Sequence, residues 1–245
     1  IYTLSLHDAL PIYQPAVRND CLFCAGATEL TKRFSNYYPN FDLRKAIFYQ
    51  TDNFITTPDM YPVVGDPYLL LIPKMHVTSF RKLGGDYHQE IAKHLSAMDQ
   101  ILNPDGKYAR VMFEHGQNKD GNQTKSVYHA HLHVVYTNFC RRKISHRVMK
   151  DILSWDAIPL PTREPSFMSA LEEQLEVDDD YLLFSIDKVH LVVKDQCHSF
   201  PSQFFRVLLA DLMGFQFINW KQASQWQLNI LGGRLNRLPL PLTAN

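Results

Sequence analysis

The sequence predicts an α+β fold, in which one long helix packs on a mostly antiparallel sheet of about five strands and a C-terminal β-hairpin and helix form an extension. Short segments of β-branched and aromatic residues, separated by turn residues, recur between positions 46 and 135. One long segment, 87–102, has its apolar residues at helical spacing instead. These two observations carry the prediction.

Composition limits the class of protein. The chain has 245 residues, 45% of them hydrophobic, which is enough for a large domain with a substantial extension. Its 25 basic residues balance 25 acidic ones, so nucleic acid is not expected as the main partner. No apolar run reaches the roughly 20 residues that span a bilayer, so no membrane partner is expected. Four cysteines without a recognisable secretory signal favour a reducing, cytoplasmic location and no structural disulfide.

The first twelve residues do not read as the start of a natural domain. Segment 1–12 contains His7 and Asp8 and lacks a basic leader, so a short signal-like segment is the weaker interpretation. We interpret it as a non-native, adapter-derived segment and give it no role. The remaining chain is then expected to divide into a domain at 13–139 and an extension at 140–245 that docks on it.

The first strands follow in order. Segments 46–49 and 53–57 read as strand, turn, strand, and the apolar run 68–72, which ends at Pro73, reads as a buried central strand. The loop before this run contains Asp59 directly after Pro58. A turn-capping carboxylate is one interpretation of Asp59 from the residues alone.

The helix and the last strands of the domain come next. Apolar Ile91, Leu95 and Met98 share one face of the helix predicted at 87–102. Segment 108–115 resumes as a strand that is expected to pair with a strand at 126–135.

The strand predicted at 126–135 carries the chemistry. Positions 129–134 read His-Ala-His-Leu-His-Val, and a period of two places all three histidines on one strand face. A half-exposed strand that carries histidines by chance is the simplest interpretation for one histidine, but less so for three in strict alternation. Imidazoles titrate near neutrality, so a cluster of them suits metal ligation, proton transfer or nucleophilic attack.

These residues resemble the histidine triad family, whose motif is His-x-His-x-His-x-x with apolar x. Ser-Val-Tyr directly before His129 is also how the nucleotide-binding branch of that family often reads. The resemblance covers mainly residues 21–137. It implies a histidine triad fold and hydrolysis or nucleotidyl transfer at the α-phosphate of a phosphoramidate, a dinucleoside polyphosphate or a nucleotidylated conjugate. The alternative is a non-catalytic nucleotide-binding or scaffold protein.

The resemblance also implies residue roles. His131 would attack the phosphorus and form a nucleotidyl-histidine that water then hydrolyses. His133 would bind the phosphate oxygens, and Ser126 would help to protonate the leaving group. Asp59 is the candidate for the ribose hydroxyls. Lys125 stands where many members have glutamine and would add positive charge near a phosphate. No organic cofactor is expected, and a homodimer is left open.

A Cys-x-x-Cys pair, Cys21 and Cys24, allows two thiolates to converge on one ion. From the residues alone, a redox dithiol and two unrelated buried cysteines stay open. The resemblance implies a zinc site completed by His76 and His129. Four protein ligands leave no open position, so such a zinc would be structural. The segment between Cys24 and the first strand is read as a long loop.

The extension is less informative. Its basic cluster, at 141–150, is interpreted as a solvated loop and helix rather than a site for polyphosphate or RNA. Prolines at 159–165 indicate a linker. Further elements are predicted as helices at 166–175 and 202–213 and as strands at 181–186 and 189–193, joined by a tight turn at 187–188. A hairpin and a helix cannot bury themselves alone, which is why docking is expected.

Overall fold

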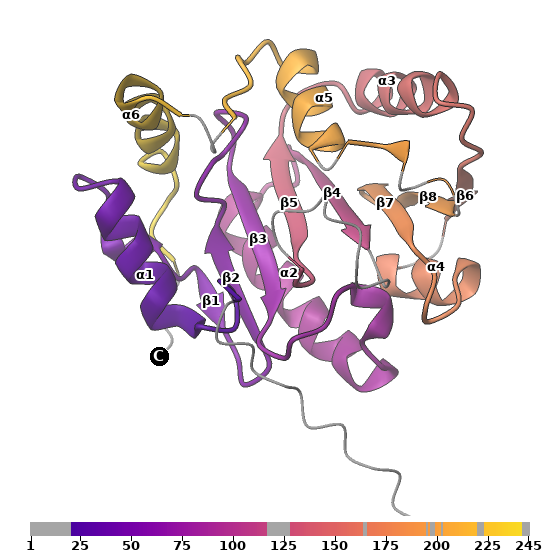
Figure 1. Cartoon of the computed structure of the whole chain (residues 1–245), viewed down its shortest axis with the longest axis horizontal. Coiled ribbons are helices and arrows are strands. Elements are labelled where there is room, and N and C mark those ends of the chain that lie inside the picture. The colour runs from indigo at the N-terminus through magenta and orange to yellow at the C-terminus, as the bar shows by residue number, and fades with distance from the viewer. Residues whose placement is uncertain are drawn as a thin grey trace, which may run out of the picture.

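Eight strands form one antiparallel sheet in the part of the chain that the computed structural model describes, namely residues 21–116, 128–163, 166–194, 196, 199–201, 203–219 and 223–241. The order across the sheet is β1-β2-β3-β5-β4-β7-β8-β6 (Figure 1). The strands are β1 Tyr49–Gln50, β2 Phe54–Pro58, β3 Tyr68–Pro73, β4 Ala109–Gly116, β5 Leu132–Thr137, β6 Leu160–Thr162, β7 Tyr181–Ile186 and β8 Val189–Lys194. The α-helices are α1 Gly26–Tyr37, α2 His88–Leu102, α3 Arg141–Leu153, α4 Phe167–Gln174, α5 Phe204–Leu212 and α6 Gln225–Leu235.

The predicted α+β class is confirmed, but the strand count is wrong. The first five strands in the sheet order lie within the segment predicted to form the domain. The extension then adds three strands to the same sheet, because β7 pairs with β4 and places Phe184 opposite Phe113. A β-hairpin gains backbone hydrogen bonds and covers an open edge by joining a sheet, which explains the longer sheet. The domain boundary at 139/140 stays a prediction.

Two helices were missed by the sequence analysis, α1 and α6. Helix α1 occupies the segment that was read as a loop after Cys24, and it buries only Leu30 and Phe34. Two apolar residues four positions apart are too few to reveal a helical period in the sequence. Helix α6 likewise buries only Leu231 and Leu235.

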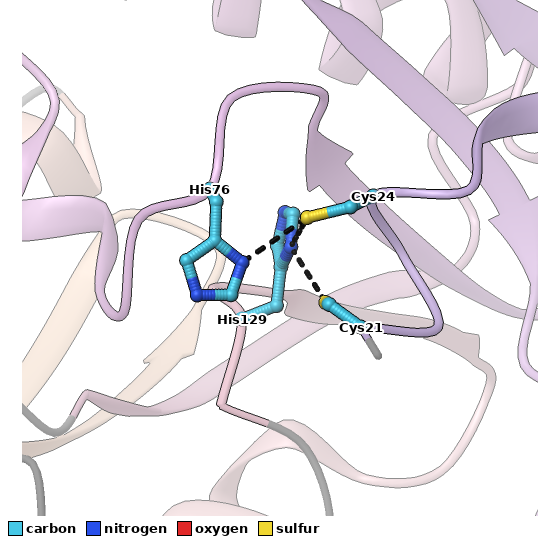
Figure 2. A group of neighbouring side chains, drawn as sticks. All are labelled: Cys21, Cys24, His76 and His129. Atoms are coloured by element: carbon cyan, nitrogen blue, oxygen red, sulfur yellow. Dashed lines mark hydrogen bonds between the residues drawn. The ribbon is translucent and has the colours of Figure 1, made fainter. Parts of the chain in front are cut away.

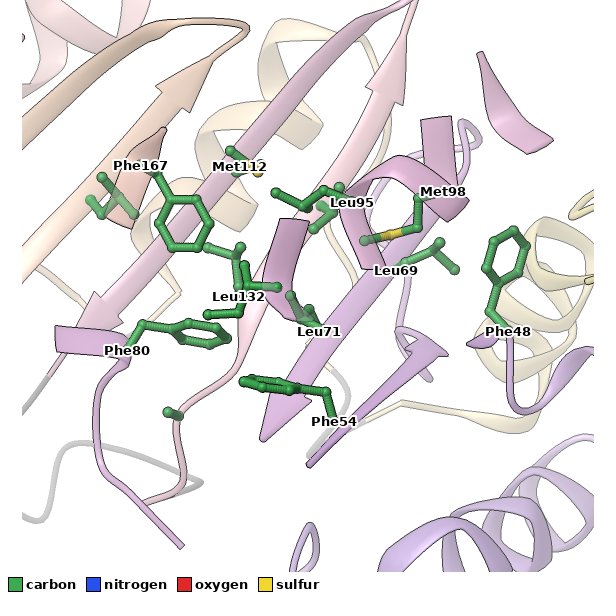
Figure 3. Packing of buried hydrophobic residues seen from close by; sticks show 14 of the residues in the cluster. Phe48, Phe54, Leu69, Leu71, Phe80, Leu95, Met98, Met112, Leu132 and Phe167 are labelled. Atoms are coloured by element: carbon green, nitrogen blue, oxygen red, sulfur yellow. The ribbon is translucent and has the colours of Figure 1, made fainter. Parts of the chain in front are cut away.

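One face of the sheet packs against α2. Leu69 and Leu71 of β3 and Leu132 of β5 share a core with Leu95 and Met98 of α2 (Figure 3). The predicted spacing of apolar residues in α2 is therefore confirmed as its buried face. Because strand side chains alternate, the neighbouring strand residues must enter a different core.

The opposite face packs against α3 and α5. Leu70 of β3 and Val135 of β5 share this second core with Ile144 of α3 and Leu209 of α5. Helix α5 thus covers the same face of β5 as His133, which alternates with Leu132 and Val134. None of the helices in the described ranges has the length and apolar character that a membrane span requires.

Helix α2 also buries one histidine beneath β2. The two ring nitrogens of His94 lie 2.7 Å from the Thr56 hydroxyl and 2.9 Å from the Thr51 hydroxyl. Burial lowers the pKa of His94 to about 4, and the nearby Glu90 offsets only part of this. The folded chain therefore holds this ring neutral at mildly acidic pH.

This burial predicts acid sensitivity. Between about pH 6.5, the usual pKa of histidine, and pH 4, the unfolded chain binds a proton that folded His94 does not. The stability contributed by the neutral ring is thus present above pH 6.5 and is lost as the pH falls toward 4, by up to about 3 kcal/mol. Urea unfolding from pH 7 to 4 should show a shallower pH dependence for His94→Asn than for wild type. The exposed His146→Asn variant is the control; equal slopes for all three would contradict the prediction.

Candidate functional site

A cavity of about 450 Å³ lies over the face of the sheet that carries His131 and His133. Its walls come from α1, from the loop after β2 and from the start of α5, so the extension borders the same cavity as the triad. The polar side chains that line it include Arg33, Tyr37, Asp59, Tyr61, His76, His115, Tyr128, Gln203 and Arg206.

The triad occupies the start of β5 rather than its middle. Regular strand pairing begins at Leu132, so His129 and His131 precede the strand, and His133 sits opposite Leu70 and Phe113. The prediction that the strand begins at 126 is therefore wrong over 128–131, and 126–127 lie outside the described residues. Ala130, Leu132 and Val134 all enter the core on the α2 side.

The backbone carbonyl of His129 orients the ring of His131. Its Nδ1 lies 2.7 Å from the carbonyl oxygen of His129. A carbonyl oxygen only accepts hydrogen bonds, so Nδ1 carries the proton, and a neutral ring has its lone pair on Nε2. The ring also lies 4.9 Å from the His133 ring, in an edge arrangement.

His133 is buried and makes contacts with several side chains. It is 8% exposed, and its ring stacks on Phe113 with centroids 4.5 Å apart. Its Nδ1 lies 2.9 Å from the Tyr68 hydroxyl and 3.6 Å from Oδ2 of Asp59. Burial lowers the pKa of His133, although its interaction with Asp59 acts in the opposite direction.

Asp59 lies in this cavity, but its carboxylate is already engaged. Oδ1 accepts a hydrogen bond from the Tyr61 N–H at 2.8 Å, and Oδ2 is bound by Arg206. Asp59 is 3% exposed, and burial alone would raise its pKa. The Arg206 guanidinium and the His133 ring, whose Nδ1 lies 3.6 Å away, outweigh that effect and hold the pKa of Asp59 well below its usual range.

Arg206 is a buried pocket residue that the sequence did not predict. It belongs to α5, is 7% exposed, and also donates from Nη2 to the Tyr61 carbonyl at 2.5 Å. One signal was available: Arg206 stands between Phe205 and Val207 in an otherwise apolar stretch of the predicted helix. A charged residue in such a stretch is rarely buried without a partner.

A second cluster brings together Cys21, Cys24, His76 and His129 (Figure 2). One ligand atom from each residue lies within 4.8 Å of all the others. The Sγ of Cys24 is 3.1 Å from Nδ1 of His76, and the Sγ of Cys21 is 3.3 Å from Nδ1 of His129. Ligands of a tetrahedral zinc with bonds of about 2.3 Å to sulfur and 2.0 Å to nitrogen are spaced by roughly 3.3 to 3.8 Å. The donor set and its spacing thus fit a zinc ion.

The hydrogen bond made by the other ring nitrogen of His129, Nε2, supports zinc binding through Nδ1. Its Nε2 lies 2.6 Å from the Pro73 carbonyl oxygen, so Nε2 carries the proton and Nδ1 has the lone pair that faces the sulfurs. Burial lowers the pKa of His129 to about 4. The ring is therefore neutral near pH 7, which is the form that binds a metal.

The structure places the predicted residues in two neighbouring groups. His131, His133 and Asp59 line the cavity, and the four predicted metal ligands converge beside it. The backbone carbonyl of His129 joins the groups by holding His131. Ser126 and Lys125 lie outside the described residues.

Comparison with known proteins adds a family match. Residues 34–148 match the family model described as scavenger mRNA decapping enzyme C-terminal binding. No curated protein matches the chain. The matched segment contains the three histidines of the motif, so this part of the chain is similar to histidine triad proteins.

Solved structures also resemble the chain. One is a histidine triad family hydrolase from Clostridium thermocellum, with 22% identity, coverage of 49% of this chain and 92% of that chain, and a TM-score of 0.32. Another is a zinc-bound histidine triad family protein from Mycobacterium smegmatis, with 21% identity, coverage of 50% and 78%, and a TM-score of 0.32. A third is a hypothetical histidine triad nucleotide-binding protein from Sulfolobus tokodaii, with 22% identity, coverage of 49% and 70%, and a TM-score of 0.31.

Proposed function

We propose that this chain is a nucleotide hydrolase or nucleotidyl transferase that acts at the α-phosphate of a nucleoside 5′-phosphate derivative, with His131 as the nucleophile. The observation that carries the proposal is the hydrogen bond between Nδ1 of His131 and the His129 carbonyl. Because Nδ1 carries the proton, a neutral ring has its nucleophilic lone pair on Nε2, and His131 lines the cavity.

The reaction would proceed in two displacements at phosphorus. Nε2 of His131 attacks the α-phosphorus, and the bond from phosphorus to the leaving group breaks with its electron pair on the leaving atom. That atom takes up a proton, which we assign to Ser126. A water molecule, or another hydroxyl acceptor in the transferase case, then attacks the phosphorus of the nucleotidyl-histidine. Its proton restores Ser126, the phosphorus–nitrogen bond breaks with its electron pair on Nε2, and neutral His131 is released. His133 would bind the phosphate oxygens, and Lys125 would add positive charge near them.

Zinc would have a structural role in this proposal. Cys21, Cys24, His76 and His129 would hold the ion, and four protein ligands fill a tetrahedral site. When bound, zinc would fix the N-terminal segment against the start of β5 and keep the His129 carbonyl in place for His131. The zinc-bound relative from Mycobacterium smegmatis is compatible with this assignment.

Turnover distinguishes this enzyme from a nucleotide-binding scaffold protein. Purified chain is incubated with adenosine phosphoramidate, diadenosine tetraphosphate and a nucleotidylated lysine conjugate, and AMP release is followed by chromatography. Release of AMP from at least one substrate supports the proposal. AMP binding by calorimetry without turnover on any of the three would instead indicate a binding protein.

A further inference from the structure

The buried contact between the C-terminal extension and the triad site carries an inference about catalysis that rests on the proposed function. Three polar groups meet behind His133: the Tyr68 hydroxyl, the Asp59 carboxylate and the Arg206 guanidinium. Asp59 and Arg206 are both more than nine-tenths buried. Arg206 is the member of this group that belongs to the extension.

We propose that Arg206 is a positioning residue of the triad site, which holds the Asp59 carboxylate beside Nδ1 of His133 and thereby fixes the ring edge that His133 presents to the cavity. Nη1 of Arg206 binds Oδ2 of Asp59, the same oxygen that lies 3.6 Å from Nδ1 of His133. A carboxylate at that position favours the proton on Nδ1. Nε2, on the opposite ring edge, is then directed to the phosphate site.

Docking of the extension does not by itself require an arginine here. Helix α5 already buries Phe205, Leu208 and Leu209 in the core that faces α3. Burying a guanidinium costs several kcal/mol unless its partners compensate, and an apolar side chain would dock α5 as well or better. A need to keep Asp59 ionised next to His133 explains why the Arg206 guanidinium is buried at this position.

The other contacts of His133 do not select its tautomer, so the tautomer depends on the pair of Asp59 and Arg206. Phe113 restricts the ring plane by stacking, but stacking does not select which nitrogen carries the proton. Tyr68 can donate to Nδ1 or accept from it. The ionised carboxylate, 3.6 Å from Nδ1, favours the tautomer with the proton on Nδ1, and Arg206 holds that carboxylate in place.

The experiment compares wild type with Arg206→Met, Arg206→Lys and Asp59→Asn. Arg147→Met is the matched control, because Arg147 pairs with Asp211 of α5 and ties α3 to α5 away from the cavity. In long-range ¹H–¹⁵N spectra, the His133 ring of wild type should show one neutral tautomer with the proton on Nδ1. Arg206→Met and Asp59→Asn should lose this signature, whereas Arg147→Met should keep it.

The kinetic arm uses whichever substrate wild type turns over. Arg206→Met should lower kcat about tenfold or more with little change in KM, and Arg206→Lys should recover part of the loss. Combining Arg206→Met with Asp59→Asn should cost little more than either change alone, because both act on His133. If Arg206→Met fails to fold, the same spectra and kinetics are measured on Arg206→Lys, which should show a smaller loss of the same kind.

Three results would overturn the inference: an unchanged His133 tautomer in Arg206→Met, a loss confined to KM, or equal losses in Arg206→Met and Arg147→Met. A higher KM alone would mean that Arg206 binds substrate directly. Absence of turnover in wild type would refute the proposed function but not this inference, because the spectra test the position of His133 without catalysis.

Discussion

His131→Ala should lower kcat at least about a thousandfold, because it removes the only group that we assign to attack the phosphorus. AMP affinity should change little, since the cavity walls and His133 remain. The measurement is steady-state turnover on the substrate that wild type cleaves, beside calorimetric AMP binding. His146→Ala, an exposed change on α3, is the control and should keep wild-type activity.

The covalent step gives this prediction a second readout. Rapid acid-free quenching and intact-mass analysis of wild type during turnover should show a species heavier by one nucleotidyl group. His131→Ala should show none. A nucleotidylated species that persists in His131→Ala, or turnover within tenfold of wild type, would assign the nucleophile to another residue.

Removal of the metal site should have the second-largest effect, this time on stability. Cys21→Ser combined with Cys24→Ser takes away both thiolates, and the remaining His76 and His129 cannot hold zinc alone. Metal binding that is coupled to folding adds stability, here on the order of 3 kcal/mol because most of the core forms without it. For a chain of this length, that corresponds to a fall in Tm of roughly 10 °C.

Zinc content by mass spectrometry and Tm by calorimetry test this prediction. Wild type should carry about one zinc per chain, and the double variant almost none. Cys140→Ser is the matched control, because Cys140 is an exposed thiol away from the cluster. Unchanged zinc content and Tm in the double variant would refute the structural zinc site. His129 would then be assigned as a phosphate contact instead.

The two predictions are linked through one carbonyl group. His129 would hold zinc through Nδ1, while its backbone oxygen fixes Nδ1 of His131. Loss of zinc should therefore also lower kcat at temperatures where the chain stays folded. If a metal-free but folded chain keeps full activity, zinc acts on stability alone.

The sequence by itself predicts the features that follow from local spacing. Alternation at 129–134 predicts one face for the histidines, and motif resemblance implies the four metal ligands that converge in the structure. The apolar spacing of α2 predicted its buried face, which Leu95 and Met98 form. Each of these features repeats within a few residues, so a strand period of two or a helix period of 3.6 makes it readable.

Tertiary structure decided which distant groups meet. Arg206 binds Asp59 across 147 positions, and no local period in either segment indicates that contact. The same holds for β7, whose pairing with β4 extends the sheet, and for α1, whose two buried residues show no period. Such contacts depend on how the elements pack and on the need to pair a buried charge. Local spacing of residues does not contain that information.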